Sequence, residues 1–463
     1  MSIFNKLVIK DRQFYKTTVS IAIPISLQNL ITTGVNMMDT IMIWTVGESE
    51  LSAVSLANQF ISIYQILCMG IGLGASVLVA RYYGMKELNA LRKAVSIMIR
   101  LCVGIATLFC AVTFFFPEQI MRSYTAEESI ITLGIRYLRF SSVTYYLLGL
   151  SLTCTIVLRN VGQVRIPLLT PIAAFFINVL ANYVFIFGKL GMPAMDVAGA
   201  ALGTLIARVF EFTVICGYLF FVDRNISFRL KHLFLKTKDL WKEYIQISIP
   251  VLISDGILAL GNSSVAMIIG RLGENFVAAN AITTVTQQLS TVVIQGFSQA
   301  SGIVTGITLG EGNRKKAQEQ GYALLGIGFL FGVISSLIIM IISGPMIAAY
   351  DVSPETELIA EQLMIAISIT VLFQATNSIM TKGILRAGGD TRVLMIADNV
   401  FLWVASVPLG ILAGFVFHLP AFWIYICLKI DQILKVFWCV FRLNSGKWIK
   451  KITTGEEQKV KAV

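Results

Sequence analysis

The sequence has few charged residues. Only 14% of its 463 residues are Asp, Glu, Lys or Arg, against about a quarter in an ordinary soluble domain. Hydrophobic residues make up 56%, and the mean hydropathy is +0.77. A water-soluble fold of this composition would leave much apolar surface exposed. The composition therefore excludes a soluble enzyme, a disordered chain and a disulfide-framed secreted module, and it predicts an all-α protein that crosses a membrane several times.

Histidine and the motifs of common active sites are also scarce. The two His are too few for a His-based metal site, and the seven Cys form no CxxC pair and lie in or beside apolar segments. No GxxxxGK[ST], HExxH or GxSxG motif is present, so the sequence indicates neither direct ATP use nor a protease or hydrolase. We expect no enzymatic activity and no cofactor. The net charge of +11 does not indicate nucleic-acid binding, because the basic residues lie between apolar segments.

Long apolar segments separated by charged or Gly- and Pro-containing stretches predict twelve membrane-spanning helices, since each needs about 20 apolar residues. The predicted spans are 18–44, 51–80, 94–116, 130–157, 165–188, 196–222, 243–270, 276–308, 317–343, 356–382, 391–417 and 420–442. An even number of spans places both termini on one side. Lys and Arg gather in the two terminal segments and in alternate loops, so both termini are predicted to be cytoplasmic.

The two halves of the sequence repeat. Ser20–Pro24 matches Gln246–Pro250 at an offset of 226, and Leu158–Arg165 matches Leu385–Arg392 at an offset of 227. Each half has an even number of predicted spans, so both halves insert in the same orientation. This predicts a parallel repeat related by an axis along the membrane normal, which is typical of transporters that rock two lobes around a central cleft.

The repeat also predicts the domain organisation. We expect six-helix lobes at 1–222 and 243–443, joined by a basic cytoplasmic linker at 223–242 and followed by a cytoplasmic tail at 444–463. The simplest interpretation of the linker is a loop that sets the topology. The alternative is a helix lying on the anionic face of the membrane.

Landmarks in both halves resemble the MATE (multidrug and toxic compound extrusion) family, within a wider group that also contains polysaccharide and lipid-linked oligosaccharide flippases. The matching segments span nearly the whole chain and are Pro24 with Asn36–Thr40, Gly47, Leu51 and Ala53, Val79–Gly84, Arg159–Gly162, Asn178–Asn182, Gly188 and Gly199–Thr204, with their second-half counterparts. The resemblance implies secondary active export of amphipathic, often cationic compounds, driven by protons or sodium ions across the plasma membrane (the inner membrane of a bacterium). The alternative function is a flippase, whose anionic substrate would require a cleft lined by Arg and Lys.

Asp39 is the candidate for ion coupling on its own physics. It lies late in the first span, where an unpaired carboxylate costs about 3 kcal/mol. It must therefore pair, bind a cation or hold a proton. Gln28, Thr32 and Asp39 project from one side of the predicted helix. A solvated, structural Asp near the external end of the span is the alternative.

Asn178 and Asn182 are four residues apart in the fifth span and share a helix face. With Asp39 and Thr204 they are suited to form an oxygen-lined sodium site, or a hydrogen-bond network around a protonated Asp39. The resemblance implies that these positions hold the coupling cation, although some members have Asp where this sequence has Asn182. Interhelical amide hydrogen bonding is the alternative.

Polar residues in other spans define a candidate cleft. Amide and Tyr side chains beside Met and Phe suit weakly specific binding of flat amphipathic cations, while ordinary packing explains any one of them. The candidates are Gln28, Gln59, Tyr64, Tyr145, Asp255, Gln288, Gln374 and Asn377. Two pairs at helical spacing, Arg208 with Glu211 and Asp431 with Lys435, are expected to be structural, with gating as the alternative for the first. We expect a monomer whose partners are small-molecule substrates and the lipid bilayer.

Overall fold

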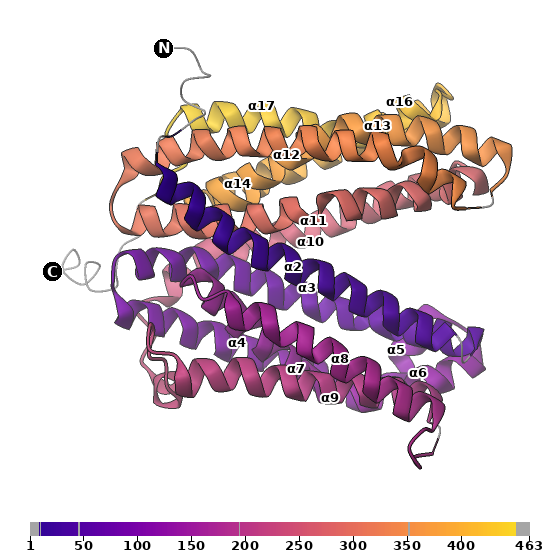
Figure 1. Cartoon of the computed structure of the whole chain (residues 1–463), viewed down its shortest axis with the longest axis horizontal. Helices are drawn as coiled ribbons and strands as arrows, with labels where there is room; N and C mark the ends of the chain where they lie inside the picture. Colours follow the sequence, from indigo (N-terminus) through magenta and orange to yellow (C-terminus); the bar gives the residue numbers. More distant parts are fainter. Residues whose placement is uncertain (1–8, 10, 45–46, 194, 351, 451–463) are drawn as a thin grey trace. The chain divides into compact units, whose positions relative to one another are not determined.

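The computed structural model describes residues 9, 11–44, 47–193, 195–350 and 352–450. Every regular element within these ranges is a helix (Figure 1). Ten helices are long and apolar enough to span a membrane. An eleventh candidate span consists of α6 (Glu128–Ser141) and α7 (Thr144–Asn160), which are bent by 54° at their junction. The chain is a multi-pass all-α membrane protein, as its composition predicts.

Each predicted span corresponds to a helical stretch. In chain order these are α2 (Arg12–Trp44), α3 (Glu48–Gly84), α4 (Leu88–Phe115), α6 with α7, α8 (Arg165–Phe187), α9 (Asp196–Gly217) with η1 (Tyr218–Val222), α10 (Trp241–Arg271), α11 (Glu274–Gly310), α12 (Arg314–Ala348), α13 (Pro354–Ser378) with η3 (Ile379–Leu385), α14 (Thr391–Val400) with η4 (Phe401–Ser406), α15 (Val407–Ile411) and η5 (Leu412–Val416), and α16 (Ala421–Leu428) with α17 (Ile430–Asn444). Two short helices, α5 (Pro117–Tyr124) and η2 (Leu230–Phe234), lie between spans. The twelfth stretch is interrupted at Lys429, so neither of its helices is long enough to span a membrane alone.

The chain forms two compact units. One contains the described residues up to Ser26 together with those from Ile249 onward, and the other contains Leu27–Ser248. The first part of α2 therefore packs with the second half of the sequence. There, Ser26 Oγ donates a hydrogen bond to the Val293 carbonyl at 3.2 Å, and Gly296 of α11 leaves room for the backbone of Ser26.

Small residues allow close helix contact in the unit formed by Leu27–Ser248. α8 and α9 pack side by side (Figure 1). A Cβ atom at Gly199 of α9 would overlap the backbone of Phe185, and one at Gly203 would overlap the side chain of Asn182. The spacing of these two glycines is the small-xxx-small pattern of membrane helix pairs. It brings the candidate amides of α8 against α9.

The segment after α17 docks onto the loop between η3 and α14. Lys450, after α17, donates its backbone N–H to the Gly388 carbonyl at 2.9 Å, and its Nζ lies 3.5 Å from the buried carboxylate of Asp390. Arg442, in the last turn of α17, binds the same carboxylate through Nε at 2.6 Å and Nη2 at 2.9 Å. Trp448 is fully buried and donates its indole N–H to Gln318 Oε1 at 2.7 Å. This segment is the described part of the predicted tail at 444–463, and the residues after 450 lie outside the described ranges.

The first half repeats this arrangement with different residues. Gln163 occupies the position equivalent to Asp390 at the offset of 227, and its Nε2 donates to Asp223 Oδ1 at 2.8 Å. Asp223 is fully buried and also accepts the backbone N–H of Ile226 at 2.9 Å. Phe228 is the fully buried aromatic residue of this segment. In each half, the chain after the sixth helical stretch is fixed to the loop between the fourth and fifth.

Candidate functional site

The two candidate amides of α8 lie together in a buried position. Asn182 Nδ2 donates to Asn178 Oδ1 at 3.3 Å, and the two residues are 1% and 3% exposed. Gly203 of α9 faces Asn182 so closely that no larger residue fits without a shift of the amide. Thr204, the next residue of α9, is half-buried. Paired amides removed from water offer both carbonyl oxygens and N–H groups, so they suit either a hard cation or a protonated carboxyl group.

Asp39, the carboxylate expected to complete this site, belongs to α2. Its side chain lies outside the described part of the structure, as do those of Asn36, Met37 and Thr40. The assignment of Asp39 to a site with the two amides and Thr204 therefore stays a prediction.

Gln28 is bound by a buried arginine. Arg159, near the end of α7, donates from Nη2 to Gln28 Oε1 of α2, and both residues are less than 10% exposed. The second half has a related pair, in which Arg386 Nη2 lies 3.4 Å from Asp255 Oδ1 of α10. The two pairs occupy equivalent positions of the repeat, because Arg386 follows Arg159 and Asp255 follows Gln28 at the same offset of 227. An ion pair in one half thus replaces a hydrogen bond between a guanidinium and a neutral amide in the other.

The two tyrosine candidates form a closed aromatic core. Tyr64 and Tyr145 are fully buried, and their ring centroids are 4.9 Å apart in an edge-to-face arrangement. Tyr64 Oη donates to the Tyr145 carbonyl at 2.6 Å, and Thr113 Oγ1 donates to Tyr145 Oη at 3.0 Å. Gln59, by contrast, is exposed on α3. Tyr64 and Tyr145 therefore contribute to the packing of the helices, whereas Gln59 lies at the surface.

Amide contacts link the candidate residues of the second half. Gln374 Oε1 of α13 accepts a hydrogen bond from Gln287 Nε2 of α11 at 2.6 Å. One turn later in α13, the buried Asn377 donates from Nδ2 to Gln432 Oε1 of α17 at 2.8 Å. Gln288 is exposed on α11. These contacts make α13 the centre of a polar network within its unit.

The two charged pairs predicted from helical spacing are present. Arg208 Nη1 lies 2.6 Å from Glu211 Oε2, and Lys435 Nζ lies 3.1 Å from Asp431 Oδ2. Lys435 also lies 3.4 Å from Asp398 Oδ1 of α14. The prediction of these pairs is confirmed, and Asp398 adds a partner from another helix that helical spacing does not reveal.

Lys382 is a candidate that the sequence analysis did not single out. Its predicted span ends at 382, whereas the observed span continues through the π-helical η3 to Leu385. The Lys382 side chain is exposed, and Asp255, Arg386 and Asp398 are among the charged groups that act on it. The predicted boundary at 382 leaves Lys382 at the end of the span, but the glycine pair that ends this helical stretch comes only at 388–389. The position of this glycine pair is the feature of the sequence that indicates a longer span, with Lys382 inside it.

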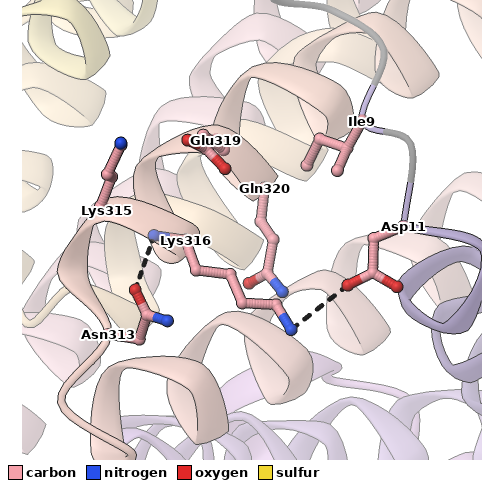
Figure 2. Close-up of a pocket in the computed structure, with 7 residues that line it drawn as sticks. All are labelled: Ile9, Asp11, Asn313, Lys315, Lys316, Glu319 and Gln320. Carbon is pink, nitrogen blue, oxygen red and sulfur yellow. Dashed lines mark hydrogen bonds and ion pairs between the residues drawn. The ribbon is translucent and has the colours of Figure 1, made fainter.

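A cavity of about 340 Å³ lies at the start of α12 beside the N-terminal segment (Figure 2). Figure 2 shows Lys316 reaching across it to Asp11, with Nζ 3.2 Å from Oδ2. The backbone N–H of Phe14 and the Lys316 ammonium hold the pKa of Asp11 below its ordinary value. The predicted site residues do not line this cavity. The ion pair of Lys316 with Asp11 connects the segment before α2 to α12.

Comparisons with known proteins relate the whole chain to membrane transporters. The family model described as MatE matches residues 24–184 and 250–412, which together are more than half of the chain. The chain is 25% identical over 462 residues to the "Probable multidrug resistance protein NorM" of Thermotoga maritima, covering 99% of this chain and 98% of that protein. It is 25% identical over 414 residues to the "Multidrug resistance protein PmpM" of Pseudomonas aeruginosa, covering 88% and 85%.

The fold is shared with solved structures. An outward-facing multidrug resistance MATE family transporter of the MOP superfamily matches with a TM-score of 0.83 at 20% identity, covering 93% of this chain and 96% of that one. At this identity the match establishes a common architecture. Residue roles have to be argued from this chain.

Proposed function

The chain belongs to the MatE family, and on that premise we propose that it is a secondary active multidrug antiporter. It exports amphipathic, often cationic compounds in exchange for protons or sodium ions by alternating access. It works as a monomer without a cofactor, in the plasma membrane (the inner membrane of a bacterium), with both termini in the cytoplasm. Its relatives named as multidrug resistance proteins support this substrate class.

The observation that carries the proposal is the buried amide pair Asn178–Asn182 at the contact of α8 with α9. Buried polar groups in a span are costly unless they bind a partner, and they mark ion pathways. In this proposal the partner is Asp39 of α2 with its bound proton or sodium ion. Thr204 adds a hydroxyl from α9.

Coupling then follows from a two-state equilibrium. A cation loaded on Asp39 from outside favours the state with lower substrate affinity, and the substrate leaves. The ion and the substrate need not touch, because each only has to bias the same equilibrium. The polar network around Gln374 and Asn377 in the other unit supplies hydrogen-bonding side chains for a flat amphipathic substrate.

A second function, flipping of a lipid-linked anionic precursor, is favoured by one observation. Lys382 is exposed within a span and lies near Arg386. A basic group in such a position suits a phosphate-bearing substrate better than a cation.

The test is ethidium efflux from cells or inside-out vesicles with proton and sodium gradients imposed separately. We expect the wild type to export the dye under one gradient and Asp39→Asn to lose at least 100-fold in rate. The matched control is Asp239→Asn. This variant removes a carboxylate of the linker that pairs with Lys93 of α4. Full activity of Asp39→Asn would contradict the coupling role. A wild type that moves no dye under either gradient but flips a labelled lipid-linked precursor would replace the antiporter with the flippase.

A further inference from the structure

The linker at 223–242, which the structure describes throughout, exposes a combination of basic and apolar side chains. Phe234 is 85% exposed and Leu230 is 50% exposed, although both belong to the ordered turn η2. The exposed basic residues of the linker are Arg224, Lys231, Lys236, Lys238 and Lys242. Large exposed apolar side chains bordered by cations mark a surface that meets a partner.

Both acidic residues of the linker already have bonding partners outside the exposed cations of the linker. The fully buried carboxylate of Asp223 accepts backbone N–H groups from Ile226 at 2.9 Å and Ser227 at 3.1 Å, besides the amide of Gln163. Asp239 Oδ2 lies 2.6 Å from Lys93 Nζ. The cations that remain at the surface are thus not balanced by acids of their own segment.

The linker is held against the side of a spanning helix. Ser96 Oγ of α4 donates to the Leu233 carbonyl at 3.1 Å. Arg100 of α4 donates from Nε to the same carbonyl at 2.7 Å and from Nη2 to the Leu235 carbonyl at 2.9 Å. Arg100 lies about 18 Å along α4 from Leu88, since a helix rises about 1.5 Å per residue. The turn η2 therefore lies alongside α4 and not beyond its end.

The turn is closed by a hydrogen bond and lies in a positive environment. The backbone N–H of Arg229 donates to His232 Nδ1 at 2.9 Å. Burial and the nearby cations Arg92, Lys231 and Arg229 lower the pKa of His232. The neutral imidazole thus fixes the turn that presents Leu230 and Phe234.

We propose that this linker is a binding site for anionic phospholipids. Leu230 and Phe234 insert among the acyl chains next to the headgroups, while Lys231, Lys236 and Lys238 bind the phosphates. The occupant is chosen by charge complementarity and by the attachment of the turn to the side of a membrane-spanning helix. Each basic residue close to an anionic leaflet strengthens binding about fivefold. The inference rests on the proposed cytoplasmic position of the linker, but it does not depend on what the protein transports.

The test uses the full-length protein in nanodiscs and a tryptophan placed at the tip of the turn. The fluorescence of the new tryptophan is the emission of Phe234→Trp minus that of the wild type. It is measured in nanodiscs that contain brominated phosphatidylglycerol and in nanodiscs that contain brominated phosphatidylcholine. We expect stronger quenching in the anionic lipid, and a loss of that difference at 1 M salt, where the screening length falls to about 3 Å. Equal quenching in both lipids would overturn the headgroup site, and no quenching in either would overturn the insertion.

Charge variants supply the second measurement, which does not depend on the engineered tryptophan. Native mass spectrometry counts the phosphatidylglycerol molecules retained by the wild type and by Lys231→Gln/Lys236→Gln/Lys238→Gln. The matched control is Arg314→Gln/Lys315→Gln/Lys447→Gln, which removes three exposed basic residues from other segments. We expect retention to fall at least tenfold in the linker variant alone. The proposal would be overturned if lipid retention fell equally in both triple variants or did not fall in either. Transport is measured separately, so that this outcome is distinguished from failure of the antiporter function.

Discussion

At the scale of single residues, the glycine at position 203, which has no side chain, determines the geometry around the candidate site. Gly203 leaves the space that the Asn182 amide occupies, and this allows α8 and α9 to approach closely. The sequence shows both residues, but only the packing of the two helices shows that one depends on the other. The two amides hydrogen-bond each other within one helix, which their spacing of four residues already predicts.

Gly203→Ala is expected to destabilise the protein. The new Cβ overlaps the Asn182 side chain, and overpacking of this kind costs about 1–3 kcal/mol. The apparent unfolding temperature in detergent micelles, followed by circular dichroism, measures the effect.

The matched control is Gly217→Ala in the same helix, where a Cβ meets no atom within 4 Å. We expect this variant to be neutral or slightly stabilised, because alanine is the better helix former. Equal unfolding temperatures for both variants would show that the α8–α9 contact tolerates a larger residue at Gly203.

At the scale of elements, the segments that follow the sixth helical stretches are attached to their own halves by buried side chains and hydrogen bonds. Each segment buries one aromatic residue, Phe228 in the first half and Trp448 in the second. Each also bonds the same repeat position, since Asp223 bonds Gln163 and Lys450 pairs with Asp390. The identities of the bonding partners differ between the halves. The repeat therefore conserves the docking arrangement through different hydrogen bonds.

Trp448→Ala is expected to release the segment after α17. The indole is fully buried and donates to Gln318, so its removal costs about 3 kcal/mol. Hydrogen–deuterium exchange should become faster in 445–450, and the unfolding temperature should fall. Trp423→Ala on α16 is the control, because that indole is 53% exposed. Unchanged exchange in 445–450 would mean that the bonds of Lys450 to Gly388 and Asp390 are sufficient to dock the segment.

At the scale of the whole molecule, the number of membrane crossings decides where the C-terminus lies. Among the residues that the structure describes, eleven helical stretches meet the length and composition expected of a span when the bent pair α6–α7 is counted as one. The twelfth, α16 with α17, is interrupted at Lys429. We expect this stretch to cross as well, because the distribution of basic residues predicts that both termini lie on one side.

Reporter fusions measure that crossing. A green fluorescent protein fused after Val463 should fluoresce, and alkaline phosphatase at the same position should be inactive, because both report a cytoplasmic end. Phosphatase fused after Gly191, in a loop predicted to be external, should be active. An active phosphatase after Val463 would mean that α16 and α17 do not cross the membrane together.

The sequence by itself determined the class, the repeated halves and most span boundaries, because these depend on local composition and on short-range periodicity. It also predicted the pairs Arg208–Glu211 and Asp431–Lys435, since both partners lie within one helical turn or so of each other. The family resemblance is confirmed by a family model that matches both halves.

Only the tertiary structure decided which polar residues are already bonded. Gln28 meets Arg159 and Asp255 meets Arg386 across more than a hundred residues of sequence. The neutralisation of Asp239 by Lys93 and the attachment of η2 to α4 likewise depend on contacts between distant segments. The physical reason is that a side chain's bonding partner is set by which helices pack together. Periodicity predicts the face of a helix on which a residue lies, but not the neighbour that covers that face.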